Sequence, residues 1–291
     1  MQQLSRRVVL TAALGTALPA RTAPDTADGF RALERAHGAR LGVFAWDTGS
    51  GARVRHRSGE LFPMCSAFKT LAVSAVLRDL EESVLGETVH YDQSDIDRAG
   101  GAPVTGRPEN LAAGMTVARL CDAAITYSDN TAANLLLERL GGPVAVTRLC
   151  RSIGDRVTRL DRWEPELNSA EPGRVTDTTS PEAIGTSYAK LAVGNALDRV
   201  DRRRLTGWLL ANTTGGERIR AGLPAHWTVG DKTGTGAYGT ANDVAIAWPP
   251  GRAPVVVAVL STHTDPAAQA DSALVKEAAA MVVDTLTRCA S

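Results

Sequence analysis

The sequence predicts an α/β fold in which an antiparallel five-stranded sheet is flanked by helices and an all-helical domain is inserted between its strands. Short β-rich segments lie near both ends of the chain, and a long stretch with helical spacing separates them. A further helical segment closes the chain. One sheet built from both ends and covered by the terminal helices is the simplest arrangement that buries all of these apolar faces.

The first residues predict an export signal over 1–23. The stretch "LSRRVVLTAALGTALPA" contains the twin arginine Arg6-Arg7, followed by a short apolar run that ends in small residues. A frayed N-terminal helix is the alternative interpretation. The apolar run is too short to span a bilayer, which favours an export signal over a membrane anchor. We therefore expect a secreted protein that uses the twin-arginine route, with no stable membrane association.

The α/β domain is expected to comprise residues 24–61 together with 211–291. Its elements are a helix over 27–40, a hairpin of strands over 41–48 and 52–58, strands over 227–236, 242–250 and 253–263, and a closing helix over 267–286. The inserted helical domain is expected over 62–210, with helices over 66–82, 116–127, 130–142 and 180–197.

Composition and charge restrict the partners that the protein can have. Lys+Arg and Asp+Glu each number 32, so the formal net charge is zero, and the longest basic block is Arg202–Arg204. A nucleic-acid partner is therefore unsupported. The five histidines and four cysteines lack metal-ligand spacing, so neither a metal nor another cofactor is expected. Nothing in the sequence demands more than a monomer.

The stretch "MCSAFKTL", residues 64–71, contains the first candidate for catalysis. On a helix, residues three apart lie on one face, so Ser66 and Lys69 are expected to meet. A serine hydroxyl needs a base within hydrogen-bond reach to act as a nucleophile, and a lysine with a depressed pKa can supply it. Taken alone, the pattern is also explained by a serine that caps a helix.

Two further motifs follow in the chain. "YSDN", residues 127–130, lies in the break between two predicted helices, and by itself it reads as a helix cap. "DKTGTG", residues 231–236, ends a predicted strand, and by itself it reads as a turn. The joint order S-x-x-K, S-D-N, K-T-G resembles the serine penicillin-recognising enzymes, most closely the class A β-lactamases.

A fourth element strengthens the resemblance. "RWEPELN", residues 162–168, resembles the omega loop of that family, which here would extend over about 162–177. The resemblance implies that Glu164 is the general base and that Arg162 and Asp177 form the charged pair at the neck of the loop. Glu166, in the same run, has no implied role. A solvated acidic loop is the alternative interpretation.

The resemblance implies hydrolysis of the β-lactam ring of penicillin-type antibiotics through a serine acyl-enzyme, which gives antibiotic resistance. Ser66 would be the nucleophile, and either Lys69 or Glu164 would take its proton. Ser128 would pass a proton to the departing nitrogen, and the backbone N–H groups of Ser66 and Thr235 would form the oxyanion hole. The residues implied to bind the substrate or the hydrolytic water are Asn130, Asn168, Arg218, Lys232, Thr233, Gly234 and Thr235.

The sequence departs from the family pattern at several positions. Ala241 stands where many members carry the carboxylate-binding arginine, and Arg218 rather than Arg220 is expected to replace it. Four cysteines allow three pairings, and sequence does not choose among them. The partner position of Cys121 in related disulfides is Val73, so that bridge is expected to be absent. Cys65 is expected to be a free thiol. Gly101 stands where an aromatic residue often walls the cleft, which suggests a more open mouth.

Two other functions share the three motifs. A D,D-peptidase would generally lack the glutamate at the position of Glu164. A non-hydrolysing β-lactam sensor would normally have a membrane segment and would lack the deacylating base. The sequence therefore favours a hydrolase whose partner is a small β-lactam molecule.

Overall fold

The structure is a computed structural model that describes residues 24–288. The expected export signal, with Arg6-Arg7, and the last cysteine, Cys289, lie outside the described residues. In the described part of the chain, no helix has the length and apolar character needed to cross a membrane.

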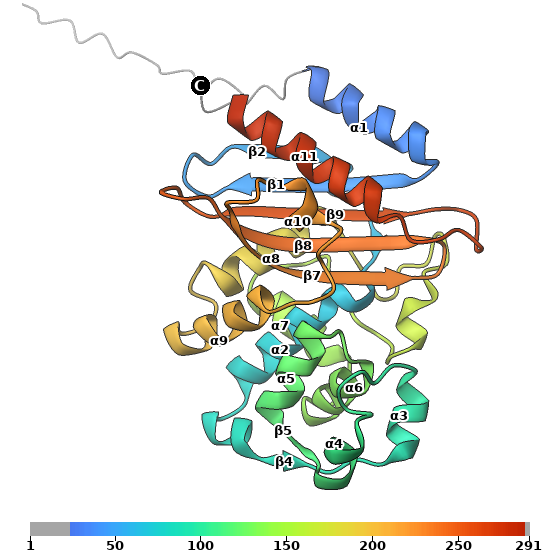
Figure 1. The fold of residues 1–291 in the computed structure, drawn as a ribbon, viewed down its shortest axis with the longest axis vertical. Coiled ribbons are helices and arrows are strands. Elements are labelled where there is room, and N and C mark those ends of the chain that lie inside the picture. Colours follow the sequence, from blue (N-terminus) through green and yellow to red (C-terminus); the bar gives the residue numbers. More distant parts are fainter. Residues whose placement is uncertain (1–23, 289–291) are drawn as a thin grey trace, which may run out of the picture.

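A five-stranded antiparallel sheet is made from both ends of the chain (Figure 1), which confirms the predicted fold class. The strand order is β2-β1-β9-β8-β7. Strand β9 therefore pairs with β1 from the N-terminal part and with β8 from the C-terminal part. The bounds are β1 Arg40–Asp47, β2 Arg53–His56, β7 Thr228–Gly236, β8 Thr240–Trp248 and β9 Val255–Thr262.

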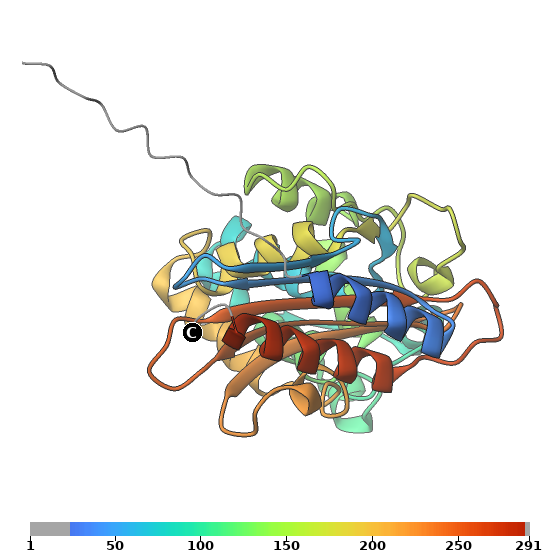
Figure 2. The ribbon, with the colours of Figure 1, turned by 90° about the horizontal axis from the view of Figure 1, so that it is seen from above.

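The two faces of the sheet bury different layers. On β9, Val257 and Val259 contribute to the core beneath the terminal helices α1 (Pro24–His37) and α11 (Ser272–Arg288), which lie side by side over this face (Figure 2). Ala258 and Leu260 face the opposite way and join the larger core shared with the helical part. This alternation is expected for a strand that is buried on both faces.

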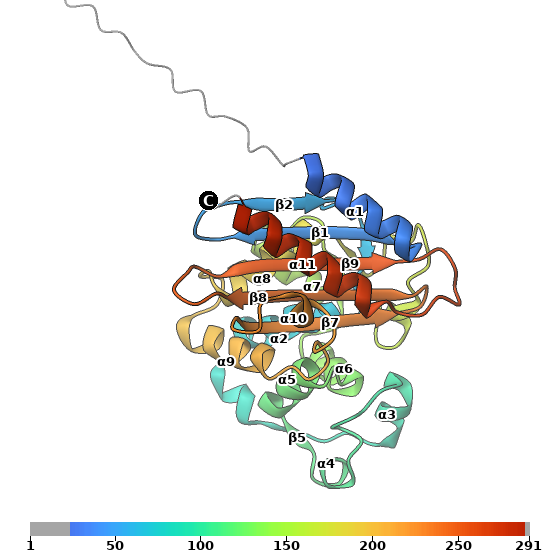
Figure 3. The ribbon, with the colours of Figure 1, turned by 45° about the horizontal axis from the view of Figure 1, so that its top comes forward.

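The helical part is built around α2 (Phe68–Asp79), whose residues 68–77 are all buried. It packs against α5, α6, α7 and α9. Figure 3 shows this helical part on one side of the sheet and the terminal helices on the other. The remaining helices are α3 Gln93–Ala99, α4 Pro108–Ala113, α5 Val117–Thr126, α6 Asn130–Arg139, α7 Val144–Ser152, α8 Pro181–Ala192, α9 Arg199–Leu210 and α10 Ile219–Gly222. Short 3-10 turns are η1 Cys65–Ala67, η2 Glu82–Gly86 and η3 Glu166–Ser169, and short strands are β3 Phe62–Pro63, β4 Thr88–Val89, β5 Met115–Thr116 and β6 Thr178–Thr179.

Helix α8 differs from its expected role inside a separate helical domain. It packs directly on β1, β8 and β9, on the face opposite the terminal helices. Gly185 permits this approach, because a Cβ atom there would lie 2.8 Å from the ring of Phe44. The helix also ends at Ala192 rather than at residue 197. The predicted domain boundaries, with residues 24–61 and 211–291 in one domain and 62–210 in the other, therefore stay a prediction. Helix α8 contacts both of these parts.

Candidate active site

Ser66 lies in the 3-10 turn η1, which continues directly into α2. The predicted α-helix thus begins at Phe68, two residues later than expected, but Ser66 and Lys69 still face the same centre. The Ser66 hydroxyl donates to Glu164 Oε1 at 3.3 Å, and Lys69 Nζ lies 3.0 Å from the same oxygen. Lys69 and Glu164 are both fully buried. A carboxylate and an amine are therefore both available close to the serine hydroxyl.

The S-D-N motif forms the second side of the site. Asp129 caps α6, and its carboxylate also accepts the backbone N–H groups of Val104 and Thr105 at 2.9 Å each. This carboxylate holds the break between α5 and α6, where Ser128 has a left-handed backbone with φ of 57°. The Ser128 hydroxyl lies 3.4 Å from Lys69 Nζ and 2.9 Å from Lys232 Nζ.

Lys69 donates to several oxygens of this motif. Its ammonium group reaches the carbonyl oxygen of Ser128 at 2.8 Å, the hydroxyl of Ser128 at 3.4 Å and Asn130 Oδ1 at 2.6 Å. Asn130 Nδ2 donates to the carbonyl oxygen of Ala99 at 3.1 Å. The expected contact of Asn130 with the substrate therefore stays a prediction, since the structure shows this side chain bound to Lys69 and Ala99.

The K-T-G motif lies on β7, the edge strand next to η1. Lys232 is fully buried and donates to the Ser128 hydroxyl at 2.9 Å. Burial, reinforced by the charge of Lys69, lowers the pKa of Lys232 to about 7. A Cβ atom at Gly234 would lie 2.8 Å from the carbonyl oxygen of Met64, so this close approach of strand and turn needs glycine. The motif therefore brings a buried amine to the hydroxyl of Ser128.

The two candidate arginines point in different directions. Arg218 donates from Nη2 to Thr235 Oγ1 at 2.8 Å, and from Nη1 to the carbonyl oxygen of Gly234 at 2.9 Å. Arg220 instead forms an ion pair with Asp231, which is fully buried. The structure thus places Arg218 against Gly234 and Thr235 of the K-T-G motif, whereas Arg220 is paired with the residue just before that motif; which of them binds the substrate carboxylate stays a prediction. Thr233, in the same motif, shares a hydrogen bond of 2.6 Å with Thr214.

Within the loop 162–177, Glu164 is held by hydrogen bonds to its side chain and to its backbone. Asn168 Nδ2 lies 2.5 Å from Glu164 Oε2. Asn134, on α6, brackets the base: its Oδ1 accepts the backbone N–H of Glu164 at 3.0 Å, and its Nδ2 donates to the carbonyl oxygen of Glu164 at 2.9 Å. Sequence reasoning missed Asn134. Its position one helical turn after Asn130 is a signal that could have pointed to it.

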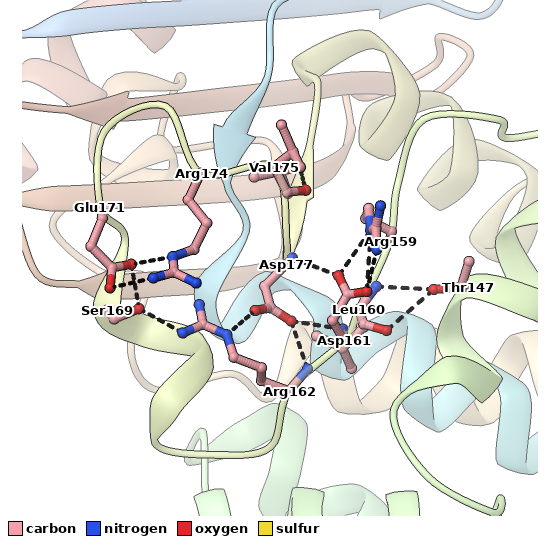
Figure 4. Close-up of polar contacts among 11 residues, drawn as sticks. Thr147, Arg159, Leu160, Asp161, Arg162, Ser169, Glu171, Arg174, Val175 and Asp177 are labelled. Atoms are coloured by element: carbon pink, nitrogen blue, oxygen red, sulfur yellow. Dashed lines mark hydrogen bonds and ion pairs between the residues drawn. The ribbon is translucent and has the colours of Figure 1, made fainter.

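The neck of the loop is closed by the expected pair (Figure 4). Arg162 Nε lies 2.6 Å from Asp177 Oδ2, and Asp177 is 1% exposed. The other carboxylate oxygen of Asp177 accepts the backbone N–H groups of Asp161 at 2.7 Å and Arg162 at 2.9 Å. Charge-assisted hydrogen bonds to a buried carboxylate are strong, so Asp177 fixes the two ends of the loop to each other. Glu166 is exposed.

The sequence predicted a free thiol at Cys65 and no bridge at Cys121, and it left Cys150 open. Cys65, Cys121 and Cys150 are free thiols, and burial raises their pKa values well above the usual range. Within residues 24–288, no group of His, Cys, Asp or Glu side chains is arranged to hold a metal ion. Gly101 lies against Asn130 and leaves no side chain at that part of the cleft.

Comparison with known proteins was made on the whole chain. Residues 25–286 match the model of the beta-lactamase enzyme family. A beta-lactamase from Streptomyces lavendulae is 60% identical over 97% of both chains, and one from Streptomyces albus G is 57% identical over the same share. The solved structure of the Streptomyces albus G beta-lactamase superposes with a TM-score of 0.89 at 61% identity, and it covers 90% of this chain and 99% of that one.

The fold and the site together define a serine hydrolase with a two-part α/β and helical architecture. The chain belongs to the beta-lactamase enzyme family. These comparisons confirm the resemblance to class A serine β-lactamases that the motifs predicted, and with it an enzyme that hydrolyses β-lactams.

Proposed function

We propose that the protein opens the β-lactam ring in two steps, through an ester on Ser66. In the first step the Ser66 oxygen attacks the lactam carbonyl. The Ser66 hydroxyl contacts Glu164 Oε1 directly, and Lys69 contacts the same carboxylate oxygen, so either group is assigned as the acceptor of the serine proton. The backbone N–H groups of Ser66 and Thr235 stabilise the developing oxyanion.

Departure of the lactam nitrogen requires a proton. The Ser128 hydroxyl lies between the two buried amines, 2.9 Å from Lys232 Nζ and 3.4 Å from Lys69 Nζ. This hydroxyl can donate its proton to the nitrogen and be reprotonated by a neighbouring ammonium group. Its position between two donors supports a relay role rather than a capping role.

Hydrolysis of the ester is assigned to Glu164 with Asn168. The Asn168 amide nitrogen contacts one oxygen of Glu164, and the other oxygen of this carboxylate faces Ser66. Asn168 Oδ1 is buried and has no hydrogen-bond partner among the described residues, so it offers an acceptor to a water molecule at the ester. The single observation that carries the proposal is this convergence of Glu164 on Ser66.

The substrate carboxylate is assigned to the strand side of the cleft. Lys232 supplies a buried positive charge, Thr233 and Thr235 supply hydroxyl donors, and Gly234 allows close approach of the strand. Arg218 contacts Thr235 and adds a second cation. Asn130 is assigned to the amide side chain of the substrate. These groups fit a penicillin-type anion.

The protein is proposed to act as an exported monomer. The twin arginine and the short apolar run that follows it support the export route, and a β-lactamase outside the cytoplasm meets antibiotics before they reach their targets.

A nitrocefin assay tests the proposal. Rapid turnover of many equivalents is expected. A burst of one equivalent, with a stable mass increase on Ser66, would favour the sensor or the D,D-peptidase and would contradict assigned deacylation by Glu164.

A further inference from the structure

A chain of polar contacts ties the outer half of the loop 162–177 to its own neck (Figure 4). Arg162, besides its ion pair at the neck, donates from Nη1 to Ser169 Oγ at 2.9 Å, and that hydroxyl donates to Glu171 Oε2 at 2.6 Å. Arg174 holds the same carboxylate, with Nε 2.7 Å from Oε2. The Ser169 hydroxyl therefore links the neck of the loop to its tip.

Apolar packing gives the tip of the loop little support. Val175 is 53% exposed, and a cavity of about 520 Å³ separates the tip from the neighbouring end of the sheet. Pro172 and Gly173 line this cavity from the loop side, and Arg40 and His263 line it from the body. Without packed side chains beneath it, the tip depends on its polar contacts.

Ser169 is also adjacent to the catalytic part of the loop. The preceding residue, Asn168, contacts Glu164 through its side chain, and its carbonyl oxygen accepts the N–H of Ala237 at 2.9 Å. The following residue, Ala170, has φ of 51°, a conformation that residues with a Cβ atom rarely adopt. The turn therefore needs support from outside its own backbone.

We infer that Ser169 is a positioning residue for deacylation: its hydroxyl, held between Arg162 and Glu171, keeps Asn168 in place against the base. Ser169 contacts no reacting atom, and it acts through its neighbour. The inference rests on the proposed function, because it assumes that Glu164 and Asn168 direct the water that cleaves the ester.

The charge on Glu171 maintains this arrangement across the working pH range. The hydrogen bond from Ser169, followed by backbone hydrogen bonding and by Arg174, lowers the pKa of Glu171 to about 2. The carboxylate thus stays ionised, and an acceptor for the Ser169 hydroxyl, at any pH well above its pKa. Loss of the hydroxyl at position 169 therefore removes the link at every such pH.

The test replaces the hydroxyl and follows the two chemical steps separately. In Ser169→Ala, decay of the acyl-enzyme, measured by rapid quenching and mass spectrometry with a penicillin, should slow by roughly 3- to 10-fold, as expected for one lost hydrogen bond. Acylation should be unchanged, so kcat and KM should fall together once deacylation limits turnover, while kcat/KM stays constant. Ser169→Thr keeps the hydroxyl and should restore most of the rate.

Glu82→Gln is the matched control. Glu82 is an exposed carboxylate paired with Arg204, outside the loop, so its loss should change neither step. Unchanged acyl-enzyme decay in Ser169→Ala would overturn the inference. So would an equal fall in kcat and kcat/KM at constant KM, which would indicate a general loss of active protein. Absence of turnover in the unsubstituted enzyme would instead overturn the proposed function.

Discussion

The two sides of the cleft each bury a lysine, but in different surroundings. On the helix side, Lys69 lies 3.0 Å from the carboxylate of Glu164. On the strand side, Lys232 donates to two neutral oxygens, the Ser128 hydroxyl and the Thr233 carbonyl. Both lysines are fully buried. The charge of Lys69 is therefore balanced by a carboxylate, whereas Lys232 has no carboxylate in direct contact among residues 24–288.

This difference assigns a task to each side. A paired amine and carboxylate can exchange protons with the serine at little electrostatic cost, which suits bond making and bond breaking. A buried amine that contacts only neutral acceptors gains most from an anion that arrives from outside. Helix and loop residues are thus expected to control the chemical steps, and strand residues are expected to control substrate affinity.

The largest effect is expected on the helix side. Glu164→Ala should slow deacylation by about 10²- to 10⁴-fold, because it removes a general base. Acylation should remain possible through Lys69, so a stable mass increase on Ser66 should accumulate with penicillin. Full turnover in this variant would break the distinction between the two sides.

The next effect concerns the strand side. Arg218→Ala should raise KM for penicillins by an amount that corresponds to roughly 1.5–3 kcal/mol, as expected for a lost charge-assisted hydrogen bond. Acylated enzyme should still be hydrolysed at the normal rate. Arg220→Ala is the comparison: it unpairs the buried Asp231 and should lower thermal stability more than affinity. An affinity loss in Arg220→Ala without one in Arg218→Ala would show that the wrong arginine was assigned.

The dependence of kcat/KM on pH tests the role of Lys232 on the strand side. Since the pKa of Lys232 is lowered to about 7, its ammonium group is charged below that pH and loses its proton as the pH rises. For substrates with a carboxylate, kcat/KM should therefore fall above about pH 7, by roughly tenfold per pH unit at most. Lys232→Arg keeps a positive charge to high pH and should remove this alkaline limb. If kcat/KM still falls above about pH 7 in that variant, a group other than Lys232 causes the fall.

The smallest effect, a loss of stability, is expected at Gly236, where the strand side of the cleft contacts the loop and the turn that precedes α2. A Cβ atom at Gly236 would lie 2.7 Å from both the carbonyl oxygen of Asn168 and the sulfur of Cys65. Gly236→Ala should force strand and loop apart and cost about 1–3 kcal/mol of stability, measured by denaturant unfolding. Gly216→Ala, where a Cβ atom would meet open space, is the control.

The sequence was most informative where the chemistry is local. Ser66 and Lys69 are one turn apart, and the change of period from helix to strand marks the sheet, so both could be predicted. The three motifs and the loop residues Glu164 and Asn168 were recognised from short stretches, and the structure brings them to one centre.

Contacts between distant residues could not be read in this way. Asn134 holds the backbone of Glu164 across 30 residues; its spacing from Asn130 places it on the same helix face, but that spacing does not say which distant residue it contacts. The Thr214 hydroxyl meets Thr233 only because two separate segments adjoin. Helix α8 was assigned to the helical part from its spacing alone. Its packing on the sheet depends on the fit of Gly185 against Phe44, which the spacing does not show. Such pairings follow from tertiary packing, which local periodicity does not specify.

The order of strands in the sheet also has a consequence for synthesis. The final strand, β9, is the piece that joins the N-terminal hairpin to β8 and β7. A ribosome-bound chain that stops before Val255 already carries the nucleophile, both amines and the loop base, but its N-terminal hairpin has no strand that joins it to β8 and β7. Because this pairing spans more than 200 residues, closing it is entropically expensive and comes late. We therefore expect full catalytic competence only after β9 has been synthesised and paired.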